Sequence, residues 1–218
     1  MTSDHYENKE HFYRQIRSMD ENYARDKLAR QGLDVRIYCE AAGMMPQIRL
    51  VSDDYSIPVY SCSGFDSLTA KFDLFTDAAR AHSWHGRGTV VLHLGDYDPS
   101  GESIFDVIAE DVHAFLADAI PHKDPQDVAI FKRAALTPEM VAHYSLPTAP
   151  PKSSDSRTRS WRGIETCQLE ALPPDILADI IQENIEAFLS EEILDQDREF
   201  ELEERRIIAK ALPAPGEG

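Results

Sequence analysis

Two carboxylates one residue apart, Asp96 and Asp98, are the clearest candidates for chemistry in this sequence. They follow an apolar run at residues 89–94 and precede an amphipathic segment. Carboxylates at the carboxyl end of a buried parallel strand project into the crevice where open α/β sheets bind their ligands. The side chains of an Asp-x-Asp alternate across a continuing strand, but Pro99 and Gly101 interrupt the strand here. Both carboxylates can therefore converge on one cation such as Mg²⁺, which proteins bind through one or two carboxylates.

A third carboxylate, Glu40, ends another apolar run at residues 35–40 and is followed by small residues. If the two runs are parallel neighbouring strands, Glu40 lies at the same sheet edge as Asp96. Three carboxylates on one edge can hold one or two divalent ions, Mg²⁺ or Mn²⁺, for phosphoryl transfer or phosphodiester cleavage. The alternatives stay open at this point: aspartates commonly form turns, Glu40 can be a solvated strand end, and Ser100 is explained equally well as a helix N-cap.

The elements that must position these residues follow an alternating pattern. Apolar runs at residues 35–40, 57–62, 89–94 and 128–131 predict strands, and helical segments separate them. This alternation is typical of an α/β protein with a parallel four-stranded sheet, right-handed crossovers and helices on both faces. One more strand is predicted at residues 165–172.

The chain divides into a helical lead-in at 1–34, an α/β domain at 35–144, a linker with basic residues at 145–163, a strand with an acidic helical extension at 164–212, and a tail at 213–218. In the lead-in, Ser18 can cap a helix that runs to Gln31. The extension predicts a helix of up to about 38 residues, broken near Ser190, and residues 174–212 hold 12 acidic and 4 basic side chains. Such a charge run is usually a solvated face, and a surface for a protein partner is the alternative.

Charge and composition restrict the partners. The formal charge of −17 disfavours indiscriminate binding to nucleic acid, because phosphate contacts need local positive charge. A local basic strip remains, in which Trp161 can stack on a base; its members are Lys132, Arg133, Lys152, Arg157, Arg159 and Arg162. No apolar run is long enough for a membrane helix and no signal peptide is recognisable, so a cytoplasmic protein is expected.

The sequence resembles a known family. The residues that carry the likeness are Cys39-Glu-Ala, Gly64-Phe-Asp-Ser-Leu-Thr and Gly95-Asp-Tyr-Asp-Pro-Ser-Gly-Glu. They resemble a Toprim domain, in the branch of the topoisomerase VI A subunit and the meiotic double-strand-break proteins, which includes bacterial and phage Toprim proteins. The resemblance covers residues 34–136 and, more loosely, 136–172.

The resemblance implies a compact parallel sheet with Mg²⁺ at its carboxyl edge and an activity on DNA. Glu40 then takes the part of the Toprim glutamate, as a metal ligand or a general acid/base, and Asp96 and Asp98 that of the paired metal-binding aspartates. Glu102, Glu170 and Ser100 are candidates for a supporting shell. Glu102 can instead favour the helix dipole, and Glu170 can be an edge-strand carboxylate.

The chain departs from the topoisomerase pattern before its first strand. Those enzymes cleave with a tyrosine on an upstream winged-helix domain, whereas Tyr6, Tyr13 and Tyr23 lie in no recognisable winged helix. We therefore expect metal-dependent hydrolysis by a nuclease rather than tyrosine-mediated strand transfer. The alternatives are a non-catalytic DNA-binding or assembly subunit of the same fold, and a phosphatase that uses Asp96 as its nucleophile. The oligomeric state is left open.

Overall fold

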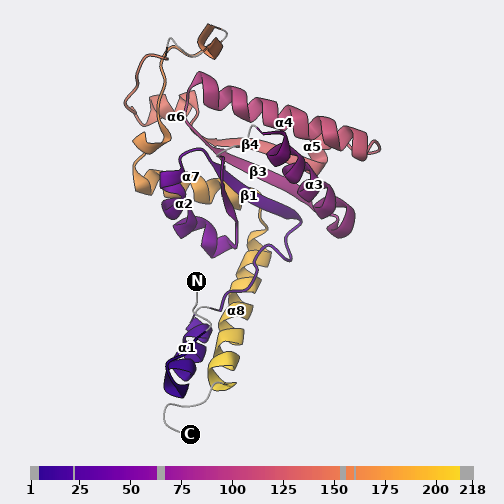
Figure 1. Cartoon of the computed structure of the whole chain (residues 1–218), viewed down its shortest axis with the longest axis vertical. Helices are drawn as coiled ribbons and strands as arrows, with labels where there is room; N and C mark the ends of the chain where they lie inside the picture. Colours follow the sequence, from indigo (N-terminus) through magenta and orange to yellow (C-terminus); the bar gives the residue numbers. More distant parts are fainter. Residues whose placement is uncertain (1–4, 22, 63–66, 153–155, 160, 212–218) are drawn as a thin grey trace.

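One parallel sheet organises the chain, for which the computed structural model describes residues 5–21, 23–62, 67–152, 156–159 and 161–211. Its strand order is β2-β1-β3-β4 (Figure 1). The strands are β1 (Leu33–Cys39), β2 (Val59–Ser61), β3 (Gly88–Leu94) and β4 (Ala129–Ala135). The central pair, β1 and β3, stays in register to the ends of both strands, where Cys39 lies opposite Leu94. The predicted α/β architecture with a parallel four-stranded sheet is confirmed.

Helices cover both faces of the sheet. α2 (Met45–Ser52) and α7 (Pro174–Glu186) lie on one face, and α3 (Leu68–His85) and α4 (Pro99–Ala119) lie on the other (Figure 1). Along β1, Ile37 belongs to the first core and Tyr38 to the second, as the alternation of a strand requires. On α4 the buried positions recur every four residues at Ile108, Val112 and Leu116. Each such side chain stabilises the fold by about 1.5–3 kcal/mol when it is fully buried.

The fourth strand is longer than predicted. The sequence predicted a strand at residues 128–131, but Val128 ends the short helix α5 (Pro125–Val128) and β4 then continues to Ala135. Lys132 and Arg133 therefore lie within the sheet. The pairing of β3 with β4 shifts between His93 and Leu94, which sets Leu94 opposite Ala135 at the carboxyl edge.

The predicted fifth strand at residues 165–172 is wrong. This segment makes two single antiparallel bridges, Tyr97 with Cys167 and Ala149 with Thr166, and then forms the 3₁₀ turn η4 (Leu169–Ala171). No ladder can grow from them, because consecutive residues pair with different segments and the Leu169 N–H donates to a side chain, Asp96. The remaining short elements are η1 (Ala42–Met44), η2 (Asp53–Tyr55), α6 (Pro138–His143) and η3 (Ser156–Arg159).

The predicted break in the C-terminal helix is confirmed. α7 ends at Glu186 and α8 (Glu191–Ala211) begins beyond Ser190. The Gln31 side chain fixes this break, since it accepts from Ser190 N at 2.8 Å and donates to Ser190 O at 3.3 Å. α7 packs into the main core together with Leu169 and Leu172. α7 thus belongs to the core of the sheet, whereas α8 extends away from it.

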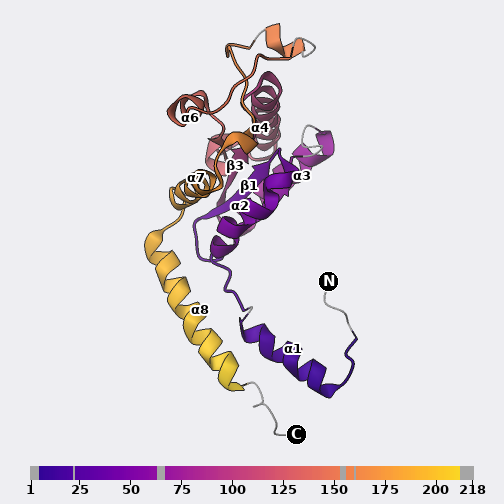
Figure 2. The ribbon, with the colours of Figure 1, turned by 90° about the vertical axis from the view of Figure 1, so that its left-hand side faces the viewer.

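The predicted lead-in helix from Ser18 to Gln31 is also wrong. The helix lies earlier, as α1 (Lys9–Glu21), and the chain from residue 23 onwards runs alongside α8 in turns. Contacts with α8 compete with helix formation there: Arg25 donates its backbone N–H to Glu201 at 2.9 Å, and its side chain reaches Asp197 and Glu204. Figure 2 shows α1 and α8 extending away from the sheet.

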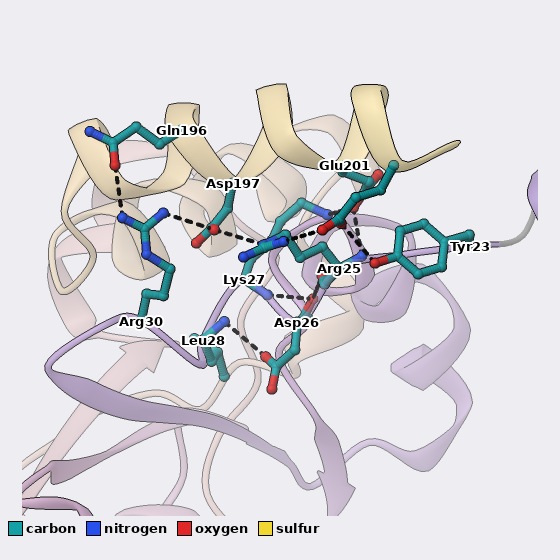
Figure 3. Close-up of polar contacts among 11 residues, drawn as sticks. Tyr23, Arg25, Asp26, Lys27, Leu28, Arg30, Gln196, Asp197 and Glu201 are labelled. Atoms are coloured by element: carbon teal, nitrogen blue, oxygen red, sulfur yellow. Dashed lines mark hydrogen bonds and ion pairs between the residues drawn. The ribbon is translucent and has the colours of Figure 1, made fainter. Parts of the chain in front are cut away.

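A dense set of ion pairs joins this N-terminal segment to α8, here called the α8 clamp and made of Arg25, Lys27, Arg30, Asp197, Glu201 and Glu204. Figure 3 shows its basic side chains directed at the acidic face of the helix. Among the residues that the structure describes, none of the helices combines the length and the apolar character that crossing a bilayer requires.

Candidate metal centre

The parallel pairing of β1 with β3 brings Glu40 and the Asp96 turn together. Glu40 directly follows β1, and its N–H donates to Leu94 O, the end of β3, at 2.9 Å. The next residue of that turn, Gly95, donates to Ala135 O and accepts from Leu136 N, both at 2.8 Å. The prediction that Glu40 and Asp96 share one edge is therefore confirmed. The turn that carries Asp96 is hydrogen-bonded to Glu40 on one side and to the end of β4 on the other.

Two glycines let the carboxylates approach each other. A Cβ on Gly95 would lie 2.6 Å from Glu40 Cδ, closer than real Cβ contacts come. A Cβ on Gly101 would lie 2.7 Å from Asp96 O, 3.1 Å from Glu40 Oε2 and 3.4 Å from Asp98 Oδ1. Carboxylate oxygens of Glu40 and Asp98 and the backbone carbonyl oxygen of Asp96 therefore surround one point at the start of α4. We call Glu40, Asp96 and Asp98 the candidate metal centre.

Glu40 is held as an ionised, oriented carboxylate. Its Oε2 accepts the Asp96 N–H at 3.3 Å, and its Oε1 lies 3.1 Å from His93 Nε2, outside hydrogen-bond geometry. Burial raises the pKa of Glu40, but the polar contact with His93 and the charge of Arg133 outweigh burial and bring the pKa below its usual value. Glu40 Oε1 is thus a buried, charged oxygen that makes no hydrogen bond within the described part of the chain.

His93 is a fully buried histidine on β3, and the sequence analysis did not identify it. Its ring stacks on Phe105 of α4 with centroids 4.8 Å apart. Burial lowers the pKa of His93, so the ring is neutral at neutral pH. A histidine inside an otherwise apolar strand was the available signal, because a buried polar side chain needs a reason to be there.

Asp96 differs from Glu40 in its electrostatics. Its Oδ1 accepts the Leu169 N–H at 2.8 Å. Burial raises the pKa of Asp96, and the charges of Glu170, Asp98 and Glu40 raise it further. Two neighbouring carboxylates whose environments move their pKa values in opposite directions are typical of functional sites. Ionised Asp96 is short of positive charge, which a bound cation would supply.

Asp98 has a structural contact that was predicted for Ser100. Its Oδ1 accepts the Gly101 N–H at 2.7 Å, so Asp98 is the N-cap of α4 and the assignment of Ser100 as the cap is wrong. The helix begins one residue earlier than expected because Pro99 occupies its first position. Ser100 Oγ instead accepts from Arg157 at 2.9 Å. An N-cap fixes the direction of the Asp98 carboxylate and leaves its second oxygen for other ligands.

Arg133 supports the centre from β4. It was predicted to contact DNA, but its guanidinium is largely buried and donates to Leu136 O at 2.8 Å and to Asp96 O. Burial lowers the pKa of Arg133, although the carboxylates around it act in the opposite direction. Arg133 therefore holds the Asp96 turn in place rather than presenting a cation to solvent. On the same strand, Lys132 lies 5.4 Å above the Phe188 ring, away from the edge.

The described parts of residues 145–163, here called the basic strap, contribute side chains beside the centre. Lys152 lines a small cavity of about 90 Å³ together with Asp96 and Asp98. Arg157 and Arg162 line a neighbouring groove at the start of α4. The fourth strap cation, Arg159, is exposed. Three of the four cations of the strap thus lie beside the centre.

The two other carboxylates predicted to support the centre, Glu102 and Glu170, lie on different elements. Glu102 Oε2 accepts from Trp161 Nε1 at 2.6 Å, so this carboxylate anchors the strap. Glu170 is exposed on η4, yet close enough to Asp96 to raise its pKa. Their roles in a metal site stay predictions.

The donor set suits a hard cation, with three carboxylates and a backbone carbonyl at one edge. Within the described ranges no three His, Cys, Asp or Glu side chains are already arranged as a metal-binding group. A site completed by one or two carboxylates and several waters, as Mg²⁺ prefers, needs no such group. No protein-family model, curated protein or solved structure matches the chain.

Proposed function

We propose that the protein is a magnesium-dependent enzyme that hydrolyses phosphodiester bonds of DNA. The observation that carries the proposal is the edge at which the carboxylates of Glu40 and Asp98 and the backbone carbonyl of Asp96 surround one point, with Lys152 lining the same cavity as Asp96 and Asp98. The resemblance of the surrounding motifs to a Toprim domain supports the same activity. When bound there, Mg²⁺ or Mn²⁺ would supply a Lewis acid and an activated water.

The residues of the chain have distinct parts in this proposal. Glu40, Asp96 and Asp98 would hold the ion, and the lowered pKa of Glu40 makes it a ligand rather than a proton donor at neutral pH. Arg133 keeps the Asp96 turn in position through backbone carbonyls. Lys152, Arg157 and Arg162 would bind the phosphates of the strand on either side of the reacting bond.

The test is nicking of supercoiled plasmid with Mg²⁺ or Mn²⁺ by the wild-type protein and by Asp96→Asn. Asparagine keeps the oxygen that accepts the Leu169 N–H, so the variant should fold. We expect the rate to fall by about 100-fold or more, the scale of losing one charge-stabilising group. The matched control, Asp118→Asn, removes an exposed carboxylate at the far end of α4 and should nick like the wild type.

Three results would overturn the proposal in different ways. Equal nicking by the wild type and Asp96→Asn would assign the activity elsewhere. Tight metal binding without nicking would favour the non-catalytic assembly subunit. Release of phosphate from a phosphomonoester, without nicking, would favour the phosphatase.

A further inference from the structure

A pocket of about 710 Å³ lies next to the candidate metal centre, between α6 and the basic strap. Apolar side chains form one wall, and Tyr97 and Arg162 belong to the rest of the lining; the apolar members include Pro138, Val141, Ala142 and Leu146. Its volume is within the range of roughly 300–1,000 Å³ that is usual for small-ligand sites. An apolar wall with one aromatic ring and one cation is a combination that suits a flat, partly polar ligand.

Tyr97 connects this pocket to the metal centre. It is the residue between Asp96 and Asp98, and in an extended turn successive side chains point to opposite sides. The two aspartates line the small cavity with Lys152, whereas Tyr97 lines the large pocket. Its backbone is fixed by two hydrogen bonds to Cys167, at 2.9 and 3.0 Å. One turn therefore presents carboxylates to one side and an aromatic ring to the other.

Trp161 holds the strap that carries Arg162. Its indole N–H donates to Glu102, its ring packs on Tyr97 with centroids 5.2 Å apart, and it occupies the space where a side chain on residue 163 would lie. Trp161 is therefore an anchor of the strap, and Tyr97, whose ring packs on it, is the aromatic residue that lines the pocket. Base stacking by Trp161 itself stays a prediction.

We propose that this pocket binds an unpaired nucleobase of a DNA strand whose phosphate lies at the metal centre, so that the substrate class is single-stranded or locally unpaired DNA. The proposal rests on the proposed function. Aromatic rings accept any base by stacking, without sequence preference. A base inside a duplex cannot enter such a pocket, because it must first leave the stack.

The position of the pocket favours a nucleic acid over an apolar protein segment as the occupant. Each cavity holds a cation beside acids: Arg162 with Glu165 in the large pocket, and Lys152 with Asp96 and Asp98 in the small one. A strand whose phosphate lies at the metal centre can contact these cations through neighbouring phosphates, whereas an apolar peptide would use neither of them. At the pocket wall, Thr148 donates to Glu165 at 2.6 Å, which offers polar groups to the edge of a base.

The experiment measures binding of a labelled oligothymidylate and of a duplex of equal length by fluorescence anisotropy, without divalent cation so that no cleavage occurs. The wild-type protein should bind the single strand at least about tenfold more tightly. Ala142→Phe, at an exposed position of α6, fills the pocket without reaching Asp96 and should weaken single-strand binding about tenfold. Ala114→Phe, at an exposed position of α4 away from the pocket, is the matched control and should bind like the wild type.

Arg162→Gln is the second variant, and it should weaken binding and make it less dependent on salt, because one phosphate contact is lost. Equal affinity of the wild type for single strand and duplex would overturn the proposal, as would unchanged single-strand binding by Ala142→Phe. Oligouridylate bound as tightly as oligothymidylate would support the pocket and widen its ligand to RNA. The proposed function would stand, and this inference would fail, if two results came together. Plasmid nicking would be lost in Asp96→Asn but unaffected by Ala142→Phe, and the wild type would bind single strand and duplex equally.

Discussion

The α8 clamp and the candidate metal centre both bury carboxylates, but the neighbours of these carboxylates differ: cations in the clamp, and other carboxylates around Asp96 in the centre. In the clamp each buried acid meets a base: Asp197 lies 2.9 Å from Arg25 and 3.1 Å from Arg30, and Glu201 lies 2.8 Å from Lys27 (Figure 3). In the centre Glu40, Asp96 and Asp98 lie at one sheet edge, the charges of Glu40 and Asp98 raise the pKa of Asp96, and the guanidinium of Arg133 donates to backbone carbonyls. Paired charges hold two segments together, whereas the like charges of the centre disfavour the ionised form of Asp96.

The pKa values follow the same division. In the clamp, burial raises the pKa of Glu201, but the hydrogen bonds from Lys27 and the Arg25 N–H together with the charges of Lys27 and Arg205 outweigh burial; the hydrogen bond from Tyr23 lowers the pKa of Glu204. Lowered pKa values mean that these carboxylates stabilise the fold above their ordinary pKa and lose that contribution as the pH falls through the folded-state pKa. The raised pKa of Asp96 has the opposite sign, so ionised Asp96 destabilises the fold at neutral pH.

The largest effect on stability is expected in the clamp. Asp197 is fully buried and Arg25 and Arg30 are about one-third exposed, with side chains 29% and 38% accessible. Asp197→Ala leaves both cations without their shared partner, and we expect the free energy of unfolding to fall by about 2–3 kcal/mol, less than for a fully buried pair. Urea unfolding followed by circular dichroism measures it.

Asp195→Ala is the matched control for the clamp, because Asp195 pairs with Arg198 on the exposed side of the same helix. Its change should stay within about 0.5 kcal/mol. Equal effects of the two substitutions would show that the clamp does not hold the N-terminal segment, and the comparison between the two regions would fail.

A smaller effect of opposite sign is expected in the metal centre. Asp96→Asn removes a like charge while keeping the oxygen that accepts the Leu169 N–H, so we expect the free energy of unfolding to rise by about 1 kcal/mol at neutral pH without divalent cations. The gain should shrink as the pH falls, because wild-type Asp96 is then protonated and no longer repels its neighbours. A destabilised variant at neutral pH would contradict the assignment of Asp96 as a site with unmatched charge.

Much of the fold could be predicted from the sequence. The parallel sheet followed from four apolar runs alternating with helices, and the shared edge of Glu40 and Asp96 followed from two runs that each end in a carboxylate. The break near Ser190 was also predicted. These features depend on local patterns and on one rule of topology, which a single sequence carries.

Features that depend on distant partners could not be predicted. Residues 165–172 have the apolar character of a strand, but Leu169 donates its N–H to a carboxylate 73 positions earlier. Residues 18–31 were predicted to be one helix, but α1 ends at Glu21, and beyond it Arg25 and Lys27 bind acidic side chains of α8. Arg133 was predicted to be a surface cation, but β4 extends to Ala135 and places Arg133 within the sheet. The acidic run in α8 has two faces, of which one forms the clamp and the other is exposed; binding of a protein partner there stays a prediction.

The most direct test of the account is calorimetric titration of the wild-type protein and Asp96→Asn with Mn²⁺ at neutral pH, repeated at lower pH. We predict that the wild type binds the ion, that Asp96→Asn binds it at least about tenfold more weakly, and that wild-type affinity falls as the pH approaches the raised pKa of Asp96. Equal, pH-independent binding by the two folded proteins would contradict the assignment of the carboxyl edge as a metal centre.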